Sequence, residues 1–254
     1  MEKAISKAII SGFAEKLTKS LSIDVAIVGG GPSGLVCGYL LAKGGHTVSI
    51  FERKLAPGGG MWGGAMLNNE IVVQCQLARF LDEFGIRHRK ATKGLLRVDS
   101  VEAASALIYK AVNAGVKLFN SVTVEDVIYK EDKIGGVVIN WTPVLLQGMH
   151  VDPLMVVSRF VVDGTGHGAL LTEKVAAKAG IRLDTPSGGI MGEKPMWAEA
   201  GERATVENTR EVYPGLVVCG MAANGVFGSA RMGPIFGGML LSGKKAAELI
   251  KSKL

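Results

Sequence analysis

A glycine-rich turn between a short apolar run and a helical pattern constrains this chain more than any other feature. Residues 23–28 read Ile-Asp-Val-Ala-Ile-Val, which is typical of a buried parallel strand, and they lead into Gly29-Gly-Gly-Pro-Ser-Gly34. Apolar residues at helical spacing follow at 35–43, and a second strand pattern at 47–51 ends at Glu52. This order predicts a βαβ unit, because neighbouring parallel strands need a crossover connection.

Three glycines and one acid predict a dinucleotide site on this unit. Gly29 permits a tight turn, Gly31 lets the backbone approach a pyrophosphate, and Gly34 lets the helix pack close to the sheet. The helix N-terminus would face the phosphates, and Glu52 would accept hydrogen bonds from a ribose diol. Glu52 should repel a 2′-phosphate, which favours NAD or FAD over NADP, although the adjacent Arg53 weakens that argument. A purely structural glycine turn is the alternative.

The remaining pattern continues as alternating strands and helices without an internal repeat or a linker. Strands are expected at 116–119, 122–129, 134–141, 160–163 and 216–219. Helices are expected at 71–84, 100–114 and 233–253, and a further helix after the 160–166 segment should end near residue 179. We therefore expect an α/β, Rossmann-like dinucleotide-binding fold of the glutathione-reductase type, with a central parallel sheet and an additional antiparallel β layer. The chain is interpreted as a single domain over 1–254, with an N-terminal amphipathic helix at 1–20 and a catalytic body at 21–254.

Two later segments are also consistent with a flavin enzyme. Val161-Val-Asp-Gly-Thr-Gly166 and Val217-Val-Cys-Gly-Met221 both resemble elements of glutathione-reductase-type FAD proteins. In that fold the late segment returns the chain to the cofactor. From the residues alone, an FAD-dependent oxidoreductase is therefore a serious alternative.

Composition and charge argue against several other classes of protein. No apolar run reaches the roughly 18 residues that a membrane span needs, and no signal peptide is expected. The net charge is +6, but the basic residues are dispersed and aromatics make up only 6%, so we expect no nucleic-acid surface. The chain has 3 cysteines, widely spaced, which favours a reducing cytoplasm over a disulfide framework. Ile5, Ile9, Phe13 and Leu17 recur every fourth residue, which predicts a helix that docks on the body or on a neighbouring subunit.

A group of histidines and an aspartate suggests a metal site. His150-Val-Asp152-Pro and Gly164-Thr-Gly-His167-Gly hold two of the 4 histidines in turns marked by glycine and proline. One carboxylate with one or two imidazoles suits a first-row divalent metal such as iron, manganese or zinc, and leaves coordination positions open for substrate. A turn-capping aspartate and an ordinary loop histidine are the alternative.

These motifs together resemble one enzyme family. The sequence is similar to the thiazole synthases of thiamine biosynthesis, in their archaeal form, from Asp24 through the terminal helix. The motifs that carry the resemblance are Gly29-Gly-Gly-Pro-Ser-Gly34, Phe51-Glu-Arg-Lys54, Gly58-Gly-Gly-Met-Trp-Gly-Gly64, His150-Val-Asp-Pro153, Thr165-Gly-His-Gly168 and Arg231-Met-Gly-Pro-Ile-Phe-Gly237. The second glycine loop and the last motif separate this family from ordinary FAD oxidoreductases.

The resemblance implies a role for each matching position. The NAD contacts that it implies, with those of the glycine turn, are Gly29, Gly31, Ser33, Gly34, Glu52, Arg53, Gly60, Val124, His150, Val151, Asp152 and Met221. Asp152 and His167 match the Fe(II) ligands of the family, supplied by neighbouring protomers of a homo-octamer. Arg231 would hold the carboxylate of glycine, because a planar guanidinium donates two parallel hydrogen bonds.

His150 is the informative departure from other members of the family. In the fungal and plant branch this position is a cysteine that gives its sulfur to the product, whereas imidazole has no sulfur to give. We therefore expect free sulfide as the sulfur source and more than one turnover per chain. His150 would act as a proton shuttle or would hydrogen-bond NAD. Asn68-Asn69 and Gly168 are smaller departures that could change the support of the metal.

The reaction implied by the resemblance starts from NAD, glycine and sulfide. NAD would lose nicotinamide, the exposed ribose would open and isomerise to a ketone, and glycine would condense with it. Sulfide addition and ring closure would give a thiazole carboxylate still linked to ADP, with Fe(II) as a Lewis acid and template. His150, Asp152 and His167 are the candidate catalytic residues. The alternative hypotheses are the flavin oxidoreductase, a catalytically silent nucleotide-binding protein and a sugar-phosphate isomerase.

Overall fold

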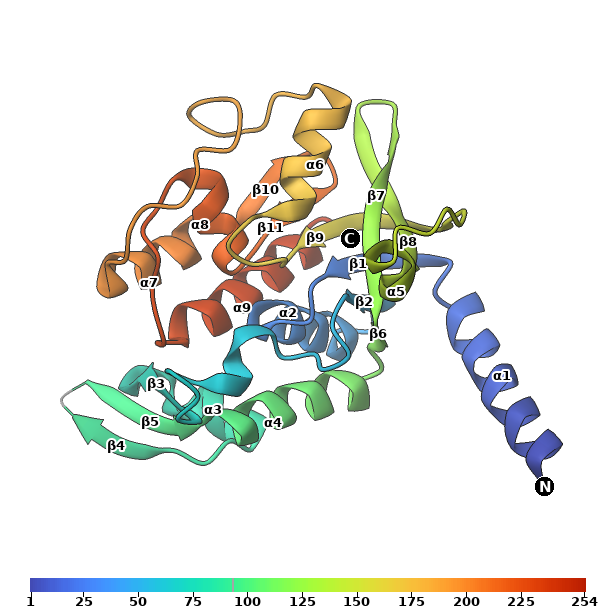
Figure 1. The fold of residues 1–254 in the computed structure, drawn as a ribbon. Coiled ribbons are helices and arrows are strands. Elements are labelled where there is room, and N and C mark those ends of the chain that lie inside the picture. Colours follow the sequence, from blue (N-terminus) through green and yellow to red (C-terminus); the bar gives the residue numbers. More distant parts are fainter. Residues whose placement is uncertain (93) are drawn as a thin grey trace.

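The computed structural model describes residues 1–92 and 94–254 and places a mostly parallel sheet at the centre of the molecule (Figure 1). This 8-stranded sheet runs in the order β10-β11-β9-β1-β2-β6, and β8 joins β7 to β9. Its strands are β1 (Ser22–Val28), β2 (Val48–Glu52), β6 (Lys117–Asn120), β7 (Val122–Lys130), β8 (Lys133–Trp141), β9 (Leu154–Asp163), β10 (Arg210–Tyr213) and β11 (Leu216–Val218). The pairs β6–β2, β2–β1, β1–β9 and β9–β11 are parallel, whereas the β7–β8 hairpin is antiparallel. The predicted fold class is confirmed.

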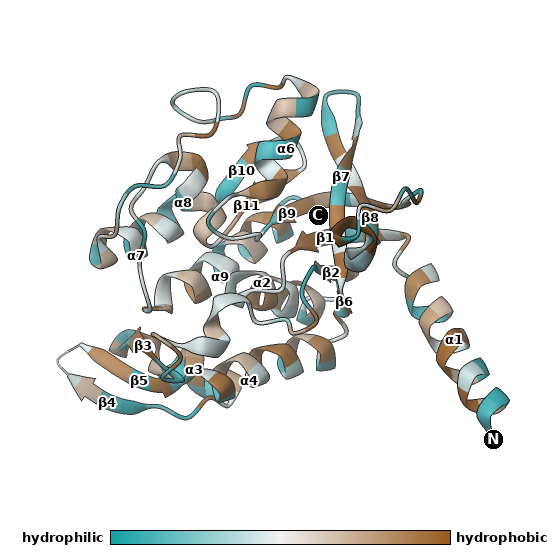
Figure 2. Ribbon diagram, viewed as in Figure 1, coloured by the Kyte–Doolittle hydropathy of each residue, from teal (hydrophilic) through white to brown (hydrophobic). Residues whose placement is uncertain are grey.

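Both faces of this sheet are apolar and are covered by other elements. The central strand β1 contributes side chains to each face in alternation. In β1, Val25 and Ile27 belong to one apolar cluster, and Ala26 and Val28 belong to the other. The first cluster is completed by α2 (Pro32–Lys43), α4 (Ser100–Asn113) and α9 (Gly237–Lys251). The second is completed by the β7–β8 hairpin with α6 (Leu170–Ala179) and α8 (Met221–Phe227). Figure 2 shows the apolar central strands and the hydrophilic tip of the hairpin.

The helix predicted at 71–84 is wrong in its first half. Residues Glu70–Gln74 form strand β3, followed by a 3₁₀ turn at Cys75–Leu77 and the short helix α3 (Ala78–Phe84). Strand β3 pairs with β5 (Leu95–Asp99), which also pairs with β4 (Arg89–Thr92). In β3, Ile71 and Val73 are buried and alternate with more exposed neighbours, so pairing with a distant strand overrides the helical spacing of the apolar residues.

The other predicted elements lie close to their observed bounds, apart from one strand that begins earlier. The strand expected at 160–163 begins earlier, at Leu154, because residues 154–157 pair with β8. The sequence did not indicate strands β4, β5 and β10, the 3₁₀ helix at Gly59–Gly63, or helices α5 (Thr142–Leu146), α7 (Ala198–Glu207) and α8.

The N-terminal helix α1 (Glu2–Thr18) projects from the body (Figure 1) and touches it only near its C-terminal end. The Phe13 ring lies 5.6 Å from the Trp141 ring, and Lys16 Nζ donates to the Leu118 carbonyl at 2.9 Å. Ile5 and Ile9 remain 52% and 67% exposed. Docking on the body is therefore confirmed only for the last two turns. Among the described residues, no helix is long and apolar enough to cross a membrane.

A buried carboxyl group joins helices α7 and α9 to strand β3. Glu202 is only 4% exposed, and its Oε2 accepts hydrogen bonds from the Gly238 amide at 2.6 Å and from the Gln74 side-chain amide. Glu202 Oε1 has no partner among the described residues. Burial raises the pKa of Glu202 above its ordinary value, because the interior solvates a carboxylate poorly.

We expect Glu202→Gln to stabilise the protein more at pH 8 than at pH 4.5. A carboxyl group with a raised folded-state pKa contributes its full stability below the unfolded-state pKa, and this contribution is lost as pH rises through the folded-state pKa. Glutamine does not titrate, keeps an acceptor for Gly238 and can donate toward Gln74. The measurement is the melting temperature of both proteins from pH 4.5 to 8. A difference between variant and wild type that shrinks as pH rises would contradict the assignment.

Candidate active site

A large cleft lies at the carboxyl ends of the parallel strands, where open α/β sheets usually bind ligands. Val28 at the end of β1, Glu52 at the end of β2 and Gly164 just after β9 all line this cleft. Its volume is about 1250 Å³. Because small-molecule pockets usually measure roughly 300–1,000 Å³, the cleft has room for a dinucleotide.

Most of the site residues predicted from sequence meet in this cleft. Its lining includes Gly29, Gly31, Ser33, Glu52, Arg53, Gly60, Val124, His167, Met221 and Arg231. Gly34 lies beneath the lining, in the packing between helix and strand. Three predicted residues lie elsewhere, namely His150, Val151 and Asp152.

The glycine turn has the geometry that its sequence predicts. Gly29 has a φ of 100°, and a Cβ there would lie 2.4 Å from the Gly164 carbonyl oxygen, so no other residue fits. A Cβ at Gly34 would lie 2.3 Å from the Gly29 oxygen, which explains how α2 packs so close to the turn. A Cβ at Gly31 would meet nothing within 4 Å. The first turn of α2 carries no acidic residue, so its amide groups and helix dipole favour an anion in the cleft.

Glu52 is buried and shapes the turn as well as lining the cleft. Its Oε2 accepts a hydrogen bond from the Gly30 amide and its Oε1 accepts one from the Lys54 amide, both at 2.8 Å. Each carboxylate oxygen has a second lone pair, so Glu52 can still accept from a ligand hydroxyl. The carboxylate therefore both organises the protein and stays available to a ligand.

Asp163 holds the second turn of the cleft, at the end of β9. Its Oδ1 accepts from the amide and hydroxyl of Thr165, and its Oδ2 accepts from the amide and hydroxyl of Thr172. These four contacts measure between 2.7 and 2.9 Å, and Asp163 is fully buried. The carboxylate thus joins the turn that carries His167 to the first residues of α6.

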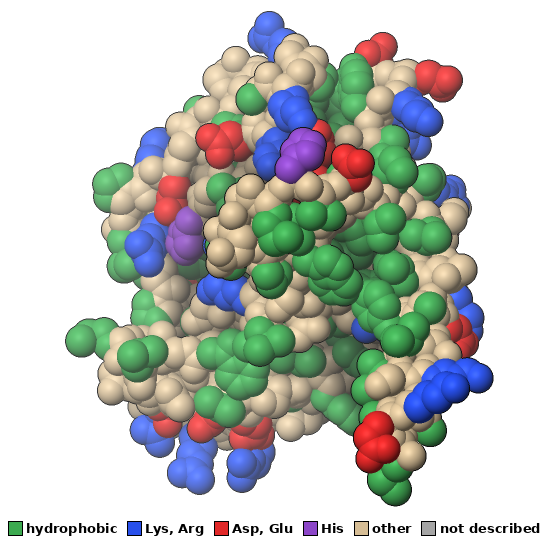
Figure 3. Space-filling view, turned by 45° about the vertical axis from the view of Figure 1, so that its right-hand side comes forward, with side chains coloured by type: hydrophobic (Ala, Val, Ile, Leu, Met, Phe, Trp, Pro, Cys, Tyr) green, Lys and Arg blue, Asp and Glu red, His purple; other side chains and the backbone are tan. Residues whose placement is uncertain are grey.

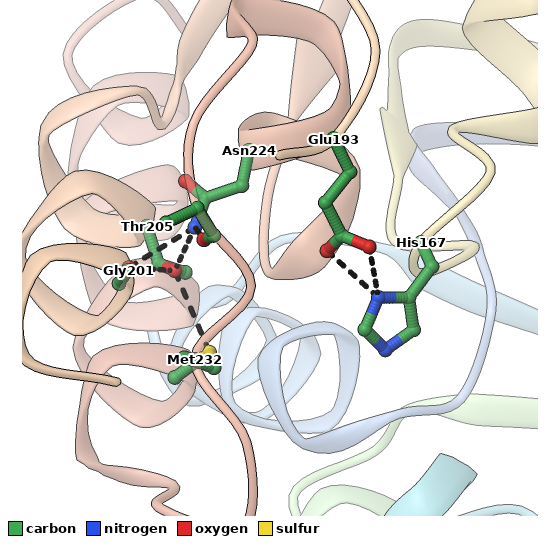
Figure 4. A network of polar contacts seen from close by, with 7 residues as sticks. His167, Glu193, Gly201, Thr205, Asn224 and Met232 are labelled. Carbon is green, nitrogen blue, oxygen red and sulfur yellow. Dashed lines mark hydrogen bonds and ion pairs between the residues drawn. The ribbon is translucent and has the colours of Figure 1, made fainter. Parts of the chain in front are cut away.

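His167 reaches the cleft from this turn and is paired with an acid from a different segment. Its Nδ1 lies 2.8 Å from Oε1 and 3.0 Å from Oε2 of Glu193. The His167 side chain is about half exposed, whereas Glu193 is mostly covered. Figure 4 shows the imidazole edge carrying Nδ1 turned toward the Glu193 carboxylate.

Arg231 lines the same cleft, in a backbone segment that pairs with the segment after Glu193. The Arg231 amide donates to the Lys194 carbonyl at 3.1 Å, and the Trp197 amide donates to the Arg231 carbonyl at 3.0 Å. The Arg231 side chain is exposed and forms no ion pair within residues 1–92 and 94–254. Its guanidinium is therefore available to an anionic ligand.

Asp152 and His167 do not meet within one chain. Val151 and Asp152 line a separate, smaller hollow of about 110 Å³ that Phe13 and Leu17 of α1 help to form. His150 is exposed next to this hollow and lines neither cavity. No cluster of three or more metal-binding side chains occurs in the part of the chain that the structure describes. A metal site that uses both Asp152 and His167 therefore needs a second copy of the chain.

The sequence analysis missed four polar residues of the site. Asp163 could have been found, because an acid that closes a strand before Gly-Thr-Gly is placed to cap that turn. Glu193 carries no local signal, since its partner His167 lies 26 residues away. Lys174 and Lys178 also line the cleft from α6, where Lys178 pairs with Asp126.

Comparison with known proteins identifies relatives over almost the whole chain. Residues 6–236 match the Thi4 family. The thiamine thiazole synthase of Thermococcus kodakarensis is 54% identical over 253 residues, which cover 100% of this chain and 98% of that protein. The one from Methanothermobacter thermautotrophicus is also 54% identical, covering 98% of this chain and 97% of that protein. The crystal structure of Thermovibrio ammonificans THI4 superposes with a TM-score of 0.98 at 54% identity, covering 100% of this chain and 98% of that one.

Replacing the buried aspartate tests whether its four contacts hold the site together. We expect Asp163→Ala to lower the free energy of unfolding by about 3 kcal/mol, because it leaves two buried donors of Thr172 and two part-buried donors of Thr165 without their charged acceptor. Asp184→Ala, an exposed aspartate, is the control and should stay within about 0.5 kcal/mol of wild type. The measurement is urea unfolding at a fixed protein concentration. Equal stability of the two variants would show that the network is unimportant.

Proposed function

The chain belongs to the Thi4 family and is an enzyme of thiamine thiazole biosynthesis, and we propose that it converts NAD, glycine and sulfide to an ADP-linked thiazole carboxylate with release of nicotinamide. The observation that carries this proposal is a single dinucleotide-sized cleft into which His167 and Arg231 both open. The first turn of α2 supports a pyrophosphate at one end of the cleft. The flavin oxidoreductase and the sugar-phosphate isomerase are not favoured, given relatives at 54% identity over the full length.

Each end of the cleft would perform a different task. Glu52 would accept the hydroxyls of the adenosine ribose, and its negative charge would exclude a 2′-phosphate. Arg231 would bind the glycine carboxylate through two parallel hydrogen bonds, which aligns the amino group with the opened ribose. His150 would contact NAD or move a proton from its exposed position beside the site of a neighbouring copy.

The donor set fits a divalent metal that is shared between two copies of the chain. His167 supplies an imidazole inside the cleft, and Asp152 supplies an exposed carboxylate outside it. Imidazole and carboxylate together suit Fe(II) and leave positions for substrate. When bound, the metal would supply Lewis-acid activation and would template the reacting groups.

Exposed apolar surface next to Asp152 supports such an assembly. Ile5, Ile9 and Ile10 of α1 are more than half exposed, and Trp141 and Leu154 are about half exposed around the hollow. Figure 3 shows apolar side chains gathered on the face from which α1 projects. A second copy that covers this face would carry Asp152 toward a neighbouring cleft. We infer a homo-oligomer with shared sites, and the family resemblance implies an octamer.

The state of the cysteines supports sulfide as the sulfur source. Burial raises the pKa of the Cys37 thiol to about 12 and raises that of Cys219 well above its ordinary value, so neither is a ready nucleophile. Cys75 is half-buried, and none of the three cysteines lines the cleft. The protein therefore has no thiol suited to give its sulfur to a ligand in this cleft.

Anaerobic incubation with NAD, glycine, sulfide and Fe(II) tests the reaction. We expect an ADP-linked thiazole carboxylate, detected by mass spectrometry, in more than one equivalent per chain, because the sulfur comes from solution. The intact mass of the protein should stay unchanged. Product limited to one equivalent, with conversion of a cysteine to dehydroalanine, would refute external sulfide. No product at all, or bound flavin in the purified protein, would refute the proposed reaction.

Mixing two inactive variants tests whether the site is shared. We expect Asp152→Ala and His167→Ala each to abolish thiazole formation while leaving NAD bound. Co-expression of both variants should restore activity, because some assemblies then pair an intact His167 with an intact Asp152 from a neighbouring copy. Activity should not return when either variant is co-expressed with the double variant. A pair of single variants that stays inactive when co-assembled would contradict the shared site.

A further inference from the structure

The contact between His167 and Glu193 resembles the one in which a carboxylate orients a metal-binding histidine. Both carboxylate oxygens of Glu193 lie within 3.0 Å of His167 Nδ1, so Nδ1 carries the proton and donates it to the carboxylate. In the neutral ring this arrangement leaves the lone pair on Nε2. Figure 4 shows that Nε2 lies on the edge of the ring that points away from Glu193. Metal-bound histidines commonly donate their other ring nitrogen to a carboxylate in this way.

Glu193 is held in place by the backbone on both sides of it. The Gly192 amide donates to the Gly225 carbonyl, and the Lys194 amide donates to the Ser229 carbonyl, both at 3.0 Å. The Glu193 side chain is only 19% exposed. A carboxylate anchored in this manner loses little further conformational entropy when it orients a neighbouring ring.

The same backbone pairing ties the segment of Glu193 to the segment of Arg231, with Lys194 paired to Ala230. The Lys194 carbonyl accepts the Arg231 amide at 3.1 Å, so the residue after Glu193 is bonded directly to the residue proposed to bind glycine. Asn224 stabilises this segment further, because its side-chain amide donates to the Ala230 carbonyl and to the Thr205 hydroxyl (Figure 4). The orientation of His167 and the position of Arg231 therefore depend on one rigid unit.

The turn that carries His167 is packed against the same unit. A Cβ at Gly225 would lie 3.0 Å from the His167 carbonyl oxygen, so glycine at this position lets α8 approach the turn closely. The backbone of His167 and the backbone around Glu193 thus both contact α8. The main chain therefore holds the two residues close enough for the imidazole and the carboxylate to meet.

We propose that Glu193 is a positioning residue for the metal site, which fixes the His167 imidazole so that Nε2 stays free to bind the metal. This inference rests on the proposed role of His167 as a metal ligand. Glu193 itself does not bind the metal, because both of its oxygens face Nδ1 of His167. Its negative charge also makes the imidazole a stronger donor through Nε2.

The experiment measures binding of Co(II), as a spectroscopic substitute for Fe(II), to the full-length assembled protein without substrates. We expect Glu193→Ala to weaken Co(II) binding roughly 10–100-fold, the usual effect of removing such a partner, and to change the visible spectrum of bound Co(II). Glu193→Gln should fall between wild type and Glu193→Ala, because the amide oxygen still accepts from Nδ1 but carries no charge. NAD binding and the melting temperature report whether each variant keeps its fold.

Two further variants separate the possible outcomes. Glu248→Gln alters an exposed glutamate on α9 whose side chain pairs with Lys244, and it should bind Co(II) like wild type. His167→Ala should bind Co(II) more weakly than any of the Glu193 variants. Unchanged Co(II) binding by His167→Ala would refute the metal role of His167 in the proposed function. Weakened binding by His167→Ala together with wild-type affinity and spectrum in both Glu193 variants would overturn only the positioning role of Glu193.

Discussion

Close backbone contact at the carboxyl edge of the sheet holds the cleft in shape, because two turns from distant parts of the chain touch where no side chain fits. A Cβ on Gly29 would lie 2.4 Å from the Gly164 oxygen, and a Cβ on Gly34 would lie 2.3 Å from the Gly29 oxygen. Asp163 ties the second turn to α6 through four hydrogen bonds. The positions of α2, of the turn that carries His167 and of the cleft between them all follow from this contact.

The cleft combines an end built within one βαβ unit, where we propose that the nucleotide binds, with an end that a single chain leaves incomplete. At the nucleotide end, α2 and Glu52 provide amide groups and a carboxylate within one βαβ unit. At the other end, His167 and Arg231 come from loops joined by backbone hydrogen bonds, while Asp152 lies in a different hollow beside the exposed helix α1. This division explains why we propose that the chemistry requires a second copy of the chain.

Local spacing predicted some parts of the structure well and others poorly. The βαβ unit at 23–52 was predictable because its strands, turn and helix are contiguous and each has its own pattern. The segment at 71–84 was predicted as a helix from apolar spacing, yet its first four residues belong to β3 because β5 offers them hydrogen-bonding partners. Pairing of that kind depends on a strand about 25 residues away, so the pattern of apolar residues in a short segment does not reveal it.

The sequence by itself determined the nucleotide end of the cleft, where three glycines and Glu52 act on their immediate neighbours within one folding unit. Through family resemblance it also pointed to His167, Asp152 and Arg231 as the candidate metal-binding and substrate-binding residues. Only the tertiary structure decided that Glu193 supports His167 and that Asp152 lies outside the cleft. These relations join segments that are distant along the chain, and packing between loops sets their distances, so no spacing between residues could reveal them.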